Sequence, residues 1–259
     1  MESPIVLTQV ENRVGFIILN RPEKRNALSP QLIKELGEAF SAMEKNQDVK
    51  VVVLKGEGKA FCAGADLDYI QEMQNFTFEE NLTDSRRLKD LFLQIYEFPK
   101  VVIAQVEGHA LAGGCGLVTV CDFAFAVPHA LFGFTEVRIG FIPALVSVFL
   151  GEKINQGKAS ELLLSGELIS AEKAKDFQLI SEVMEPESIA EKVDQFAQNL
   201  VKDNSGFSMM ETKSMLRSFS RKARIDALET AAELNAKARS HEDCKKGIAA
   251  FLAKTKPEW

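Results

Sequence analysis

Two glycine-rich segments have the composition of turns that bind an anion through the backbone. GEGKAFCAGADL (residues 56–67) follows the apolar run VKVVVLK, and GHALAGGCGLVTVCD (108–122) follows VVIAQVE. Each pattern predicts a strand that leads into a glycine turn and then a helix. The start of a helix has N–H groups without intrahelical partners, and the helix dipole makes that end positive. Two such turns facing each other could direct two N–H groups at one developing oxyanion.

A single carboxylate lies in a stretch of the chain that is otherwise strongly apolar. Glu136 belongs to the segment LFGFTEVRIGFIPALVSVFLG (131–151), where phenylalanines and branched aliphatic residues surround it. Burial among such neighbours raises the pKa of a carboxyl group. A carboxylate that is positioned beside a carbon acid can accelerate proton transfer by about 10²–10⁴-fold. We therefore expect Glu136 to be a desolvated carboxylate with a raised pKa, rather than a surface or helix-capping carboxylate.

Strands and helices alternate along the first two thirds of the chain, which predicts an α/β fold. Residues 5–10 and 14–20 are expected to form a hairpin, and Ser29 with Pro30 has the pattern of a helix N-cap. Residues 68–80 are poorly periodic, so we expect either a mobile or irregular segment that walls a pocket or a pair of surface helices. Better helical periodicity follows at 83–97, 155–164 and 170–177, the last capped by Ser170. From Pro186 onward the chain is nearly all helical.

Composition excludes several classes of protein. The 259 residues are 46% apolar and 26% charged, with a net charge of −6, and no basic cluster suggests a nucleic-acid partner. Neither a signal peptide nor an apolar run of membrane-spanning length is visible, so we expect a cytoplasmic protein without a membrane partner. The four cysteines form no CxxC pair, and no cluster has metal-ligand spacing, so we expect free thiols and no metal. Cys62 and Cys115, beside the glycine turns, are interpreted as packing residues.

Six segments in order resemble the motifs of the enoyl-CoA hydratase/isomerase (crotonase) superfamily, and the resemblance covers essentially the whole chain. These segments are NRPEKRNALS (20–29), GKAFCAGADL (58–67), GHALAGGCGL (108–117), FGFTEVRIGFIP (132–143), KASELLLSGELISAEKAKDFQLISEV (158–183) and GIAAFLAKTKPEW (247–259). The resemblance implies a spiral of ββα turns in residues 1–195 and a helical trimerisation region in 196–259. It also implies an acyl-CoA substrate, no cofactor beyond that coenzyme A, and a homotrimer or dimer of trimers.

The resemblance further implies the residues of the active site. The thioester oxygen would lie between the backbone N–H groups of Ala63 and Gly113, with Glu136 as the catalytic acid. The first loop would contact coenzyme A, the segment after the first glycine turn would line the adenine pocket, and the C-terminal helix would reach coenzyme A of the same or an adjacent subunit. The residues expected to bind the substrate are Arg25, Ala27, Leu28, Ala63, Gly64, Ala65, Asp66, Leu67, Gly113, Phe251 and Lys254.

One departure from the family pattern leaves the reaction open. Hydratases of the family pair two glutamates across a water molecule, and here Gly116 replaces the first of them. One glutamate is compatible with hydration of an α,β-unsaturated acyl-CoA, with double-bond isomerisation, or with decarboxylation of an acyl group on coenzyme A or a carrier protein. A catalytically impaired CoA-binding homologue is a further alternative, and a thioester hydrolase has no additional residues in its favour.

The segment TEVRIGFIPALVSVFL and Gly116 resemble the branch of the family associated with 3-methylglutaconyl-CoA hydratase. That substrate carries a second carboxylate, which a cation would have to meet. The candidates are Arg86, Arg87, Lys89 and Arg138, although the first three also fit a solvated helix face. The favoured function is therefore an enoyl-CoA hydratase type of lyase, with 3-methylglutaconyl-CoA as one candidate substrate.

Overall fold

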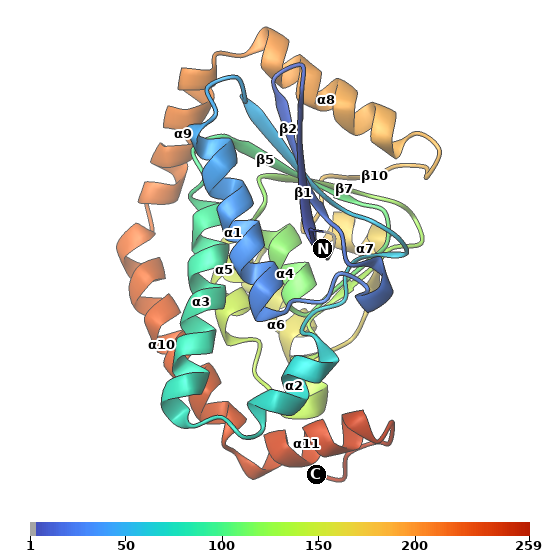
Figure 1. Cartoon of the computed structure of the whole chain (residues 1–259), viewed down its shortest axis with the longest axis vertical. Coiled ribbons are helices and arrows are strands. Elements are labelled where there is room, and N and C mark those ends of the chain that lie inside the picture. Colours follow the sequence, from blue (N-terminus) through green and yellow to red (C-terminus); the bar gives the residue numbers. More distant parts are fainter. Residues whose placement is uncertain (1–3) are drawn as a thin grey trace.

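A six-stranded sheet runs through the centre of the computed structural model, which describes residues 4–259 (Figure 1). β1 and β2 form the expected antiparallel hairpin, and every other neighbouring pair in this sheet is parallel. All six residues of β5 are buried, as expected for a central parallel strand covered on both faces. In sheet order the strands are β1 (Val6–Glu11), β2 (Val14–Leu19), β3 (Val51–Gly56), β5 (Val101–Val106), β7 (Phe123–Ala126) and β10 (Glu182–Val183).

A second sheet consists of four very short strands. In sheet order they are β4 (Ala60–Cys62), β6 (His109–Leu111), β8 (Leu131–Gly133) and β9 (Ile169–Ser170). Strands β4, β6 and β8 each follow a strand of the larger sheet and precede a helical segment, which gives the repeated ββα turns that the sequence resemblance implies. The prediction that each long strand leads directly into a glycine turn is wrong, because β4 and β6 intervene. Three residues are too few to produce a periodic sequence signal.

Helices cover the two sheets, and the N-caps expected at Ser29 and Ser170 are confirmed. The Ser29 hydroxyl accepts a hydrogen bond from the backbone N–H of Leu32 at 3.2 Å, and Ser170 accepts from Lys173 at the same distance. The helices are α1 (Pro30–Lys45), α2 (Leu67–Met73), α3 (Phe78–Tyr96), α4 (Gly113–Val120), α5 (Ala144–Lys153), α6 (Gln156–Ser165), α7 (Ala171–Asp176), α8 (Ile189–Asp203), α9 (Gly206–Ser218), α10 (Arg221–Arg239) and α11 (Glu242–Leu252), with the 3₁₀ turns η1 (Pro22–Lys24) and η2 (Glu136–Ile139).

Residues 68–80 form helix α2 and the first turn of α3, so the helix expected at 83–97 begins five residues earlier. Thr77 and Glu80 form a reciprocal capping box that starts α3 at Phe78. Asp66 caps α2 by accepting a hydrogen bond from the backbone N–H of Asp68 at 2.9 Å. The weak periodicity of this stretch reflects two helices joined by residues 74–77. Of the two alternatives, the irregular segment is wrong and the pair of helices is confirmed, while Tyr69, Ile70 and Met73 line a pocket.

The C-terminal helices spread over the outside of the core. α8 lies across one end of the large sheet, α10 runs beside α3, and α11 lies beside α2 at the opposite end of the protein (Figure 1). The boundary expected between residues 195 and 196 falls inside α8, whose buried face includes Ile189, Val193 and Ala197. α8 therefore belongs to the packed core. No helix within residues 4–259 is long and apolar enough to cross a membrane.

Candidate active site

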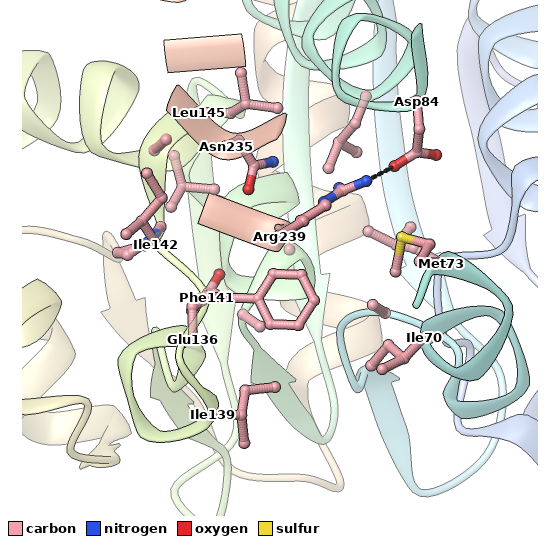
Figure 2. Close-up of a pocket in the computed structure, with 18 of the residues that line it drawn as sticks. Ile70, Met73, Asp84, Glu136, Ile139, Phe141, Ile142, Leu145, Asn235 and Arg239 are labelled. Carbon is pink, nitrogen blue, oxygen red and sulfur yellow. Dashed lines mark hydrogen bonds and ion pairs between the residues drawn. The ribbon is translucent and has the colours of Figure 1, made fainter. Parts of the chain in front are cut away.

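One pocket is lined by Glu136, by both glycine-rich turns and by several other polar side chains, and we call it the central pocket (Figure 2). Its walls come from the two glycine turns, from η2 and the start of α5, and from α2, α3, α10 and α11. Most of the lining is apolar. The polar side chains that reach it are those of Tyr69, Asp84, Thr135, Glu136, Asn235 and Arg239.

The two glycine-rich turns pack directly against each other. Gly64 has a φ of +90°, and a Cβ placed there would lie 2.9 Å from the Cβ of Ala112 and 3.1 Å from the carbonyl oxygen of Leu111. A Cβ on Gly114 would lie 2.2 Å from the carbonyl oxygen of Cys62. No side chain fits at either position, so glycine permits the close approach of the two backbones. Both turns therefore face the same space.

The N–H group of Ala63 is not available to a ligand, which corrects the donor expected from the sequence. It donates a hydrogen bond of 3.0 Å to the carbonyl oxygen of Arg25. Two residues later, Ala65 is exposed in the central pocket, and its N–H makes no hydrogen bond within residues 4–259. The flanking groups hold it in place, since Leu28 donates to the Gly64 carbonyl at 2.7 Å and accepts from Asp66 at 3.0 Å. Ala65 thus replaces Ala63 as the candidate donor.

The second candidate donor is the N–H of Gly113, at the first position of α4. It lines the same pocket and, as expected for a first helical turn, has no hydrogen-bond partner within residues 4–259. The preceding residue, Ala112, has φ +49° and ψ −123°, a conformation that non-glycine residues rarely adopt. Strained backbone of this kind is concentrated at functional sites. It sets the direction in which α4 begins and therefore the direction of the Gly113 N–H.

Glu136 and Asp84 both line the central pocket, but Asp84 pairs with Arg239, whereas Glu136 forms no salt bridge within residues 4–259. Glu136 begins η2, and its Oε2 atom is buried without a hydrogen-bond partner among the described residues. Desolvation raises the pKa of this carboxyl to about 7, against a smaller opposite effect of its own backbone N–H. A carboxyl with such a pKa can both accept and donate a proton near neutral pH. The apolar neighbourhood predicted from the sequence is therefore confirmed.

At position 116 the structure has no room for a side chain without movement of its neighbours. A Cβ on Gly116 would lie 2.6 Å from Val146 and 2.8 Å from the ring of Phe92. Val146 and Phe92 also line the central pocket, so apolar groups occupy the space that a side chain at 116 would need. Apolar side chains therefore border the pocket at position 116, where the family pattern has the first glutamate.

The loop before α1 is held against the first glycine turn and the start of α2 by Arg21, Lys24 and Asn26, which the sequence interpretation did not single out. Arg21 pairs with the carboxylate of Asp66 at 2.9 Å, and Lys24 pairs with Asp68 at 2.7 Å. Asn26 is fully buried and donates to the carbonyl oxygens of Glu57 and Ala60 at 2.9 and 2.8 Å. These contacts explain why the loop and the turn are adjacent, although the sequence separates them by about 40 residues.

The residues expected to bind the substrate fall into two groups. Leu28, Ala63, Ala65, Gly113, Glu136 and Phe251 line the central pocket. Arg25, Leu67 and Lys254 are exposed outside it, Ala27 is buried, Gly64 supports the turn, and the Asp66 carboxylate is engaged by Arg21 and by its capping role. The fold of a single chain thus brings six of the predicted residues together.

Of the cations considered for a second carboxylate, none lines the central pocket. Arg86 and Lys89 pair with Glu229, and Arg87 and Arg138 are exposed. The guanidinium that does reach the pocket belongs to Arg239, which pairs with Asp84 (Figure 2). The sequence could show only that Arg239 lies four residues after Asn235 and so shares a helical face with it. It could not show that the fold brings α10 to the pocket.

The thiols near the glycine turns are packing groups, as expected. Cys62 and Cys115 are fully buried, and burial raises the pKa of the Cys62 thiol to about 12. Burial likewise raises the pKa of Cys115, and the nearby Glu136 carboxylate adds to that effect. Within residues 4–259, no group of three or more His, Cys, Asp or Glu side chains is placed to hold a metal ion.

Comparison with known proteins agrees with the fold and with the pocket. The enoyl-CoA hydratase/isomerase family model matches residues 9–259. A Thermus thermophilus protein named "Putative enoyl-CoA hydratase" is 39% identical over 98% of this chain and 100% of its own length. The mitochondrial enoyl-CoA hydratase of Pongo abelii is 35% identical over 95% of this chain and 83% of its own. A crystal structure of an enoyl-CoA hydratase from Mycobacterium avium superposes with a TM-score of 0.88 at 31% identity, covering 100% of both chains.

These matches define the class of protein as an α/β enzyme with the crotonase fold. The chain belongs to the enoyl-CoA hydratase/isomerase family. The resemblance found in the sequence is confirmed at the level of the superfamily.

Proposed function

We propose that the protein hydrates α,β-unsaturated acyl-CoA thioesters, or dehydrates the corresponding 3-hydroxyacyl-CoA, with Glu136 as the single acid and base. The observation that carries this proposal is that one pocket holds a buried carboxylate and two backbone N–H groups, those of Ala65 and Gly113, that have no hydrogen-bond partner among residues 4–259. The family relationship supports the same general reaction.

In the proposed mechanism, the N–H groups of Ala65 and Gly113 donate to the thioester oxygen and polarise the conjugated system. Ionised Glu136 takes a proton from a water molecule while the oxygen of that water bonds to C3. The electron pair of the C2–C3 double bond moves toward the thioester, which forms an enolate. Protonated Glu136 then returns its proton to C2. A backbone donor of this kind stabilises an oxyanion by about 2.7–4 kcal/mol in comparable enzymes. The pKa near 7 suits a group that performs both transfers.

The apolar wall at Gly116 favours a second candidate reaction, the isomerisation of a 3-enoyl-CoA to a 2-enoyl-CoA. This reaction needs no bound water, because one carboxylate can remove a proton from C2 and deliver it to C4. In hydratases with two glutamates, the second carboxylate helps to hold that water. Here Phe92 and Val146 occupy the space that a carboxylate side chain at position 116 would need. Decarboxylation, on coenzyme A or on a carrier protein, would use the same oxyanion donors without requiring a second acid.

The finer substrate assignment rests on the resemblance in residues 135–150. It makes 3-methylglutaconyl-CoA a candidate substrate, with water added across its conjugated double bond. We also propose that coenzyme A contacts Arg25, Leu67 and Lys254, and that residues 196–259 assemble the protein into a homotrimer or a dimer of trimers. Exposed apolar side chains on and next to α9 support that assembly, namely Phe207, Met215, Leu216 and Phe219.

The test is to supply purified protein with crotonyl-CoA, 3-methylglutaconyl-CoA and a 3-enoyl-CoA, and to follow the absorbance of the conjugated thioester. Loss of that absorbance with the first two substrates, abolished in Glu136→Gln, is the expected result for a hydratase. A gain of absorbance with the 3-enoyl-CoA alone would identify an isomerase. Tight CoA binding without turnover of any of them, unaffected by Glu136→Gln, would identify a catalytically impaired homologue and contradict the proposal.

A further inference from the structure

Two polar side chains of α10 enter the central pocket from the same helical face. Asn235 and Arg239 are four residues apart, the spacing that places side chains above one another on a helix. Both line the pocket, and Figure 2 shows them on neighbouring turns, with the ring of Phe141 beside Arg239. The guanidinium carbon lies 5.9 Å from the centre of that ring. The mechanism proposed above uses neither side chain.

The side chain of Arg239 is largely buried, but only some of its N–H groups form hydrogen bonds. Its side chain is 8% exposed, and Nη1 donates to Asn81 Oδ1 at 3.2 Å and to Asp84 Oδ2 at 2.6 Å. These two bonds use both hydrogens of Nη1. Nε is buried without a partner, and Nη2 makes no hydrogen bond to any residue from 4 to 259. One whole edge of the guanidinium thus remains without an acceptor.

Asp84 cannot satisfy that edge as well, because it is held on its other side. The hydroxyl of Tyr69 donates to Asp84 Oδ1 at 2.5 Å, while Oδ2 already faces Nη1 of Arg239. Arg87, one helical turn further along α3, lies close enough to interact electrostatically with Tyr69. Arg87 is exposed and does not line the pocket, so the cation that the described residues place at this end of the pocket is Arg239.

The free edge of Arg239 carries an N–H of Nε beside those of Nη2. This edge presents two parallel donors, which is the geometry that both oxygens of a carboxylate accept. The rest of this region is apolar, including Ile70, Met73 and Leu145. A hydrocarbon tail would leave the buried Nε donor unpaired, and a site with an unpaired buried donor discriminates against ligands that lack the acceptor.

We propose that Arg239 determines substrate specificity by binding a carboxylate at the far end of the acyl chain. The substrates would then be CoA thioesters of dicarboxylic acids, with Asn81, Asp84 and Tyr69 holding the guanidinium in position. The inference rests on the proposed function in one respect, namely that the thioester end lies at Ala65 and Gly113.

The experiment measures binding rather than turnover, so that it does not depend on the reaction. Saturated thioesters that cannot react are titrated calorimetrically in matched pairs: valeryl-CoA against glutaryl-CoA, and hexanoyl-CoA against adipyl-CoA. Each pair differs in a terminal methyl or carboxylate at equal carbon number. The protein is expected to bind at least one dicarboxylate-derived thioester about tenfold or more tightly than its partner, as a bidentate charged contact would give.

Three variants make the comparison specific. Arg239→Lys keeps the charge but loses the paired donors, and the double variant Asp84→Asn/Arg239→Met removes both charges without leaving Asp84 unpaired. Both are expected to reduce the preference to about twofold or less, since a bidentate contact is lost. Arg221→Met is the matched control, because Arg221 lies on the same helix, pairs with Glu97 and is 62% exposed. It should retain the wild-type preference.

Two results would overturn the inference: equal or weaker binding of both dicarboxylate-derived thioesters by the wild type, or an unchanged preference in the double variant. Hydration assays on crotonyl-CoA separate this failure from failure of the proposed function. Hydration without a carboxylate preference rejects only the role of Arg239. A carboxylate preference without hydration or dehydration of any thioester supports Arg239 and rejects the proposed reaction.

Discussion

The central pocket and the interface that α9 and α10 form with the core both remove ionisable side chains from water, but they stabilise them differently. In the pocket, Glu136 has a buried oxygen that finds no hydrogen-bond partner in the described part of the chain, and burial raises the pKa of this carboxyl to about 7. At the interface, Asp122 accepts from Lys213 at 2.6 Å and from Arg217 at 3.1 Å. Fully buried Arg224 pairs with Glu152 at 2.9 Å and with Glu97 at 3.3 Å.

The pKa of Glu152 shows the effect of that pairing. Burial alone would raise it, but hydrogen bonds from Tyr96 and Ser220 and the charge of Arg224 outweigh burial and lower it. A paired carboxylate stays ionised and fixes helices in place, whereas an unpaired one can exchange a proton near neutral pH. The contrast indicates that the interface is structural and that the pocket is the place of chemistry.

The largest difference between the two regions should appear in the turnover rate when Glu136 and Glu152 are each replaced by glutamine. Glu136→Gln is expected to lower the turnover rate on an enoyl-CoA by about 10²–10⁴-fold, because the amide cannot transfer the proton. Glu152→Gln should leave the rate unchanged and lower the melting temperature instead. Steady-state rates and calorimetry on both variants test the contrast. A Glu152→Gln variant that is fully folded but inactive would contradict the assignment of the interface as purely structural.

Removing the central cation of the interface should reduce stability without affecting chemistry. Arg224→Leu leaves Glu97 and Glu152 without their buried partner, and breaking a buried pair costs about 3–5 kcal/mol of the free energy of unfolding. Denaturant titration measures this loss. The control is Arg221→Leu, a mostly exposed arginine on the same helix that also pairs with Glu97, for which about 0–1 kcal/mol is expected. Similar losses in the two variants would contradict a buried structural network.

The pH dependence of stability should reveal Glu136 directly. Its pKa is about 7 in the folded protein and near 4.5 when unfolded, so the folded state binds the extra proton between these values. The resulting stability is fully present below pH 4.5 and is lost as the pH rises through 7, by about 3 kcal/mol in total.

The measurement compares the free energy of unfolding of wild type and Glu136→Gln at pH 5 and pH 8. The free energy of unfolding of Glu136→Gln should rise relative to that of the wild type as the pH rises, because the variant has no charge to bury. The hydration rate of the wild type should rise across the same interval, as the general base becomes ionised. A difference between the two proteins that does not change with pH would show that Glu136 is not desolvated.

The smallest effect is expected for the cysteines. Cys62 and Cys115 are buried beside the catalytic turns, and burial raises the pKa of both thiols far above neutrality. Iodoacetamide should therefore not label either residue in the native protein, and treatment should leave the turnover rate unchanged. Mass spectrometry of the treated protein, with unfolded protein as the positive control, measures the labelling. Rapid modification of Cys115 with loss of activity would give this thiol a role in the site.

Local sequence determined much of the fold and part of the site. Ser29 and Ser170 cap helices because their hydroxyls reach N–H groups three residues away, and the hairpin of β1 and β2 follows from two short β-rich runs. The apolar stretch around Glu136 was enough to indicate a raised pKa. The six motifs were specific enough to indicate the family and the crotonase fold.

Only the tertiary structure decided the details on which the chemistry depends. The sequence could not distinguish the N–H of Ala63 from that of Ala65, because the carbonyl of Arg25 that occupies the first one comes from a separate loop. Gly116 is explained by Phe92 and Val146, and Arg239 reaches the pocket from a helix about 100 residues after Glu136. The physical reason is the same in each case. Hydrogen-bond partners and free volume belong to segments far apart in the chain, and local patterns carry no information about how those segments meet.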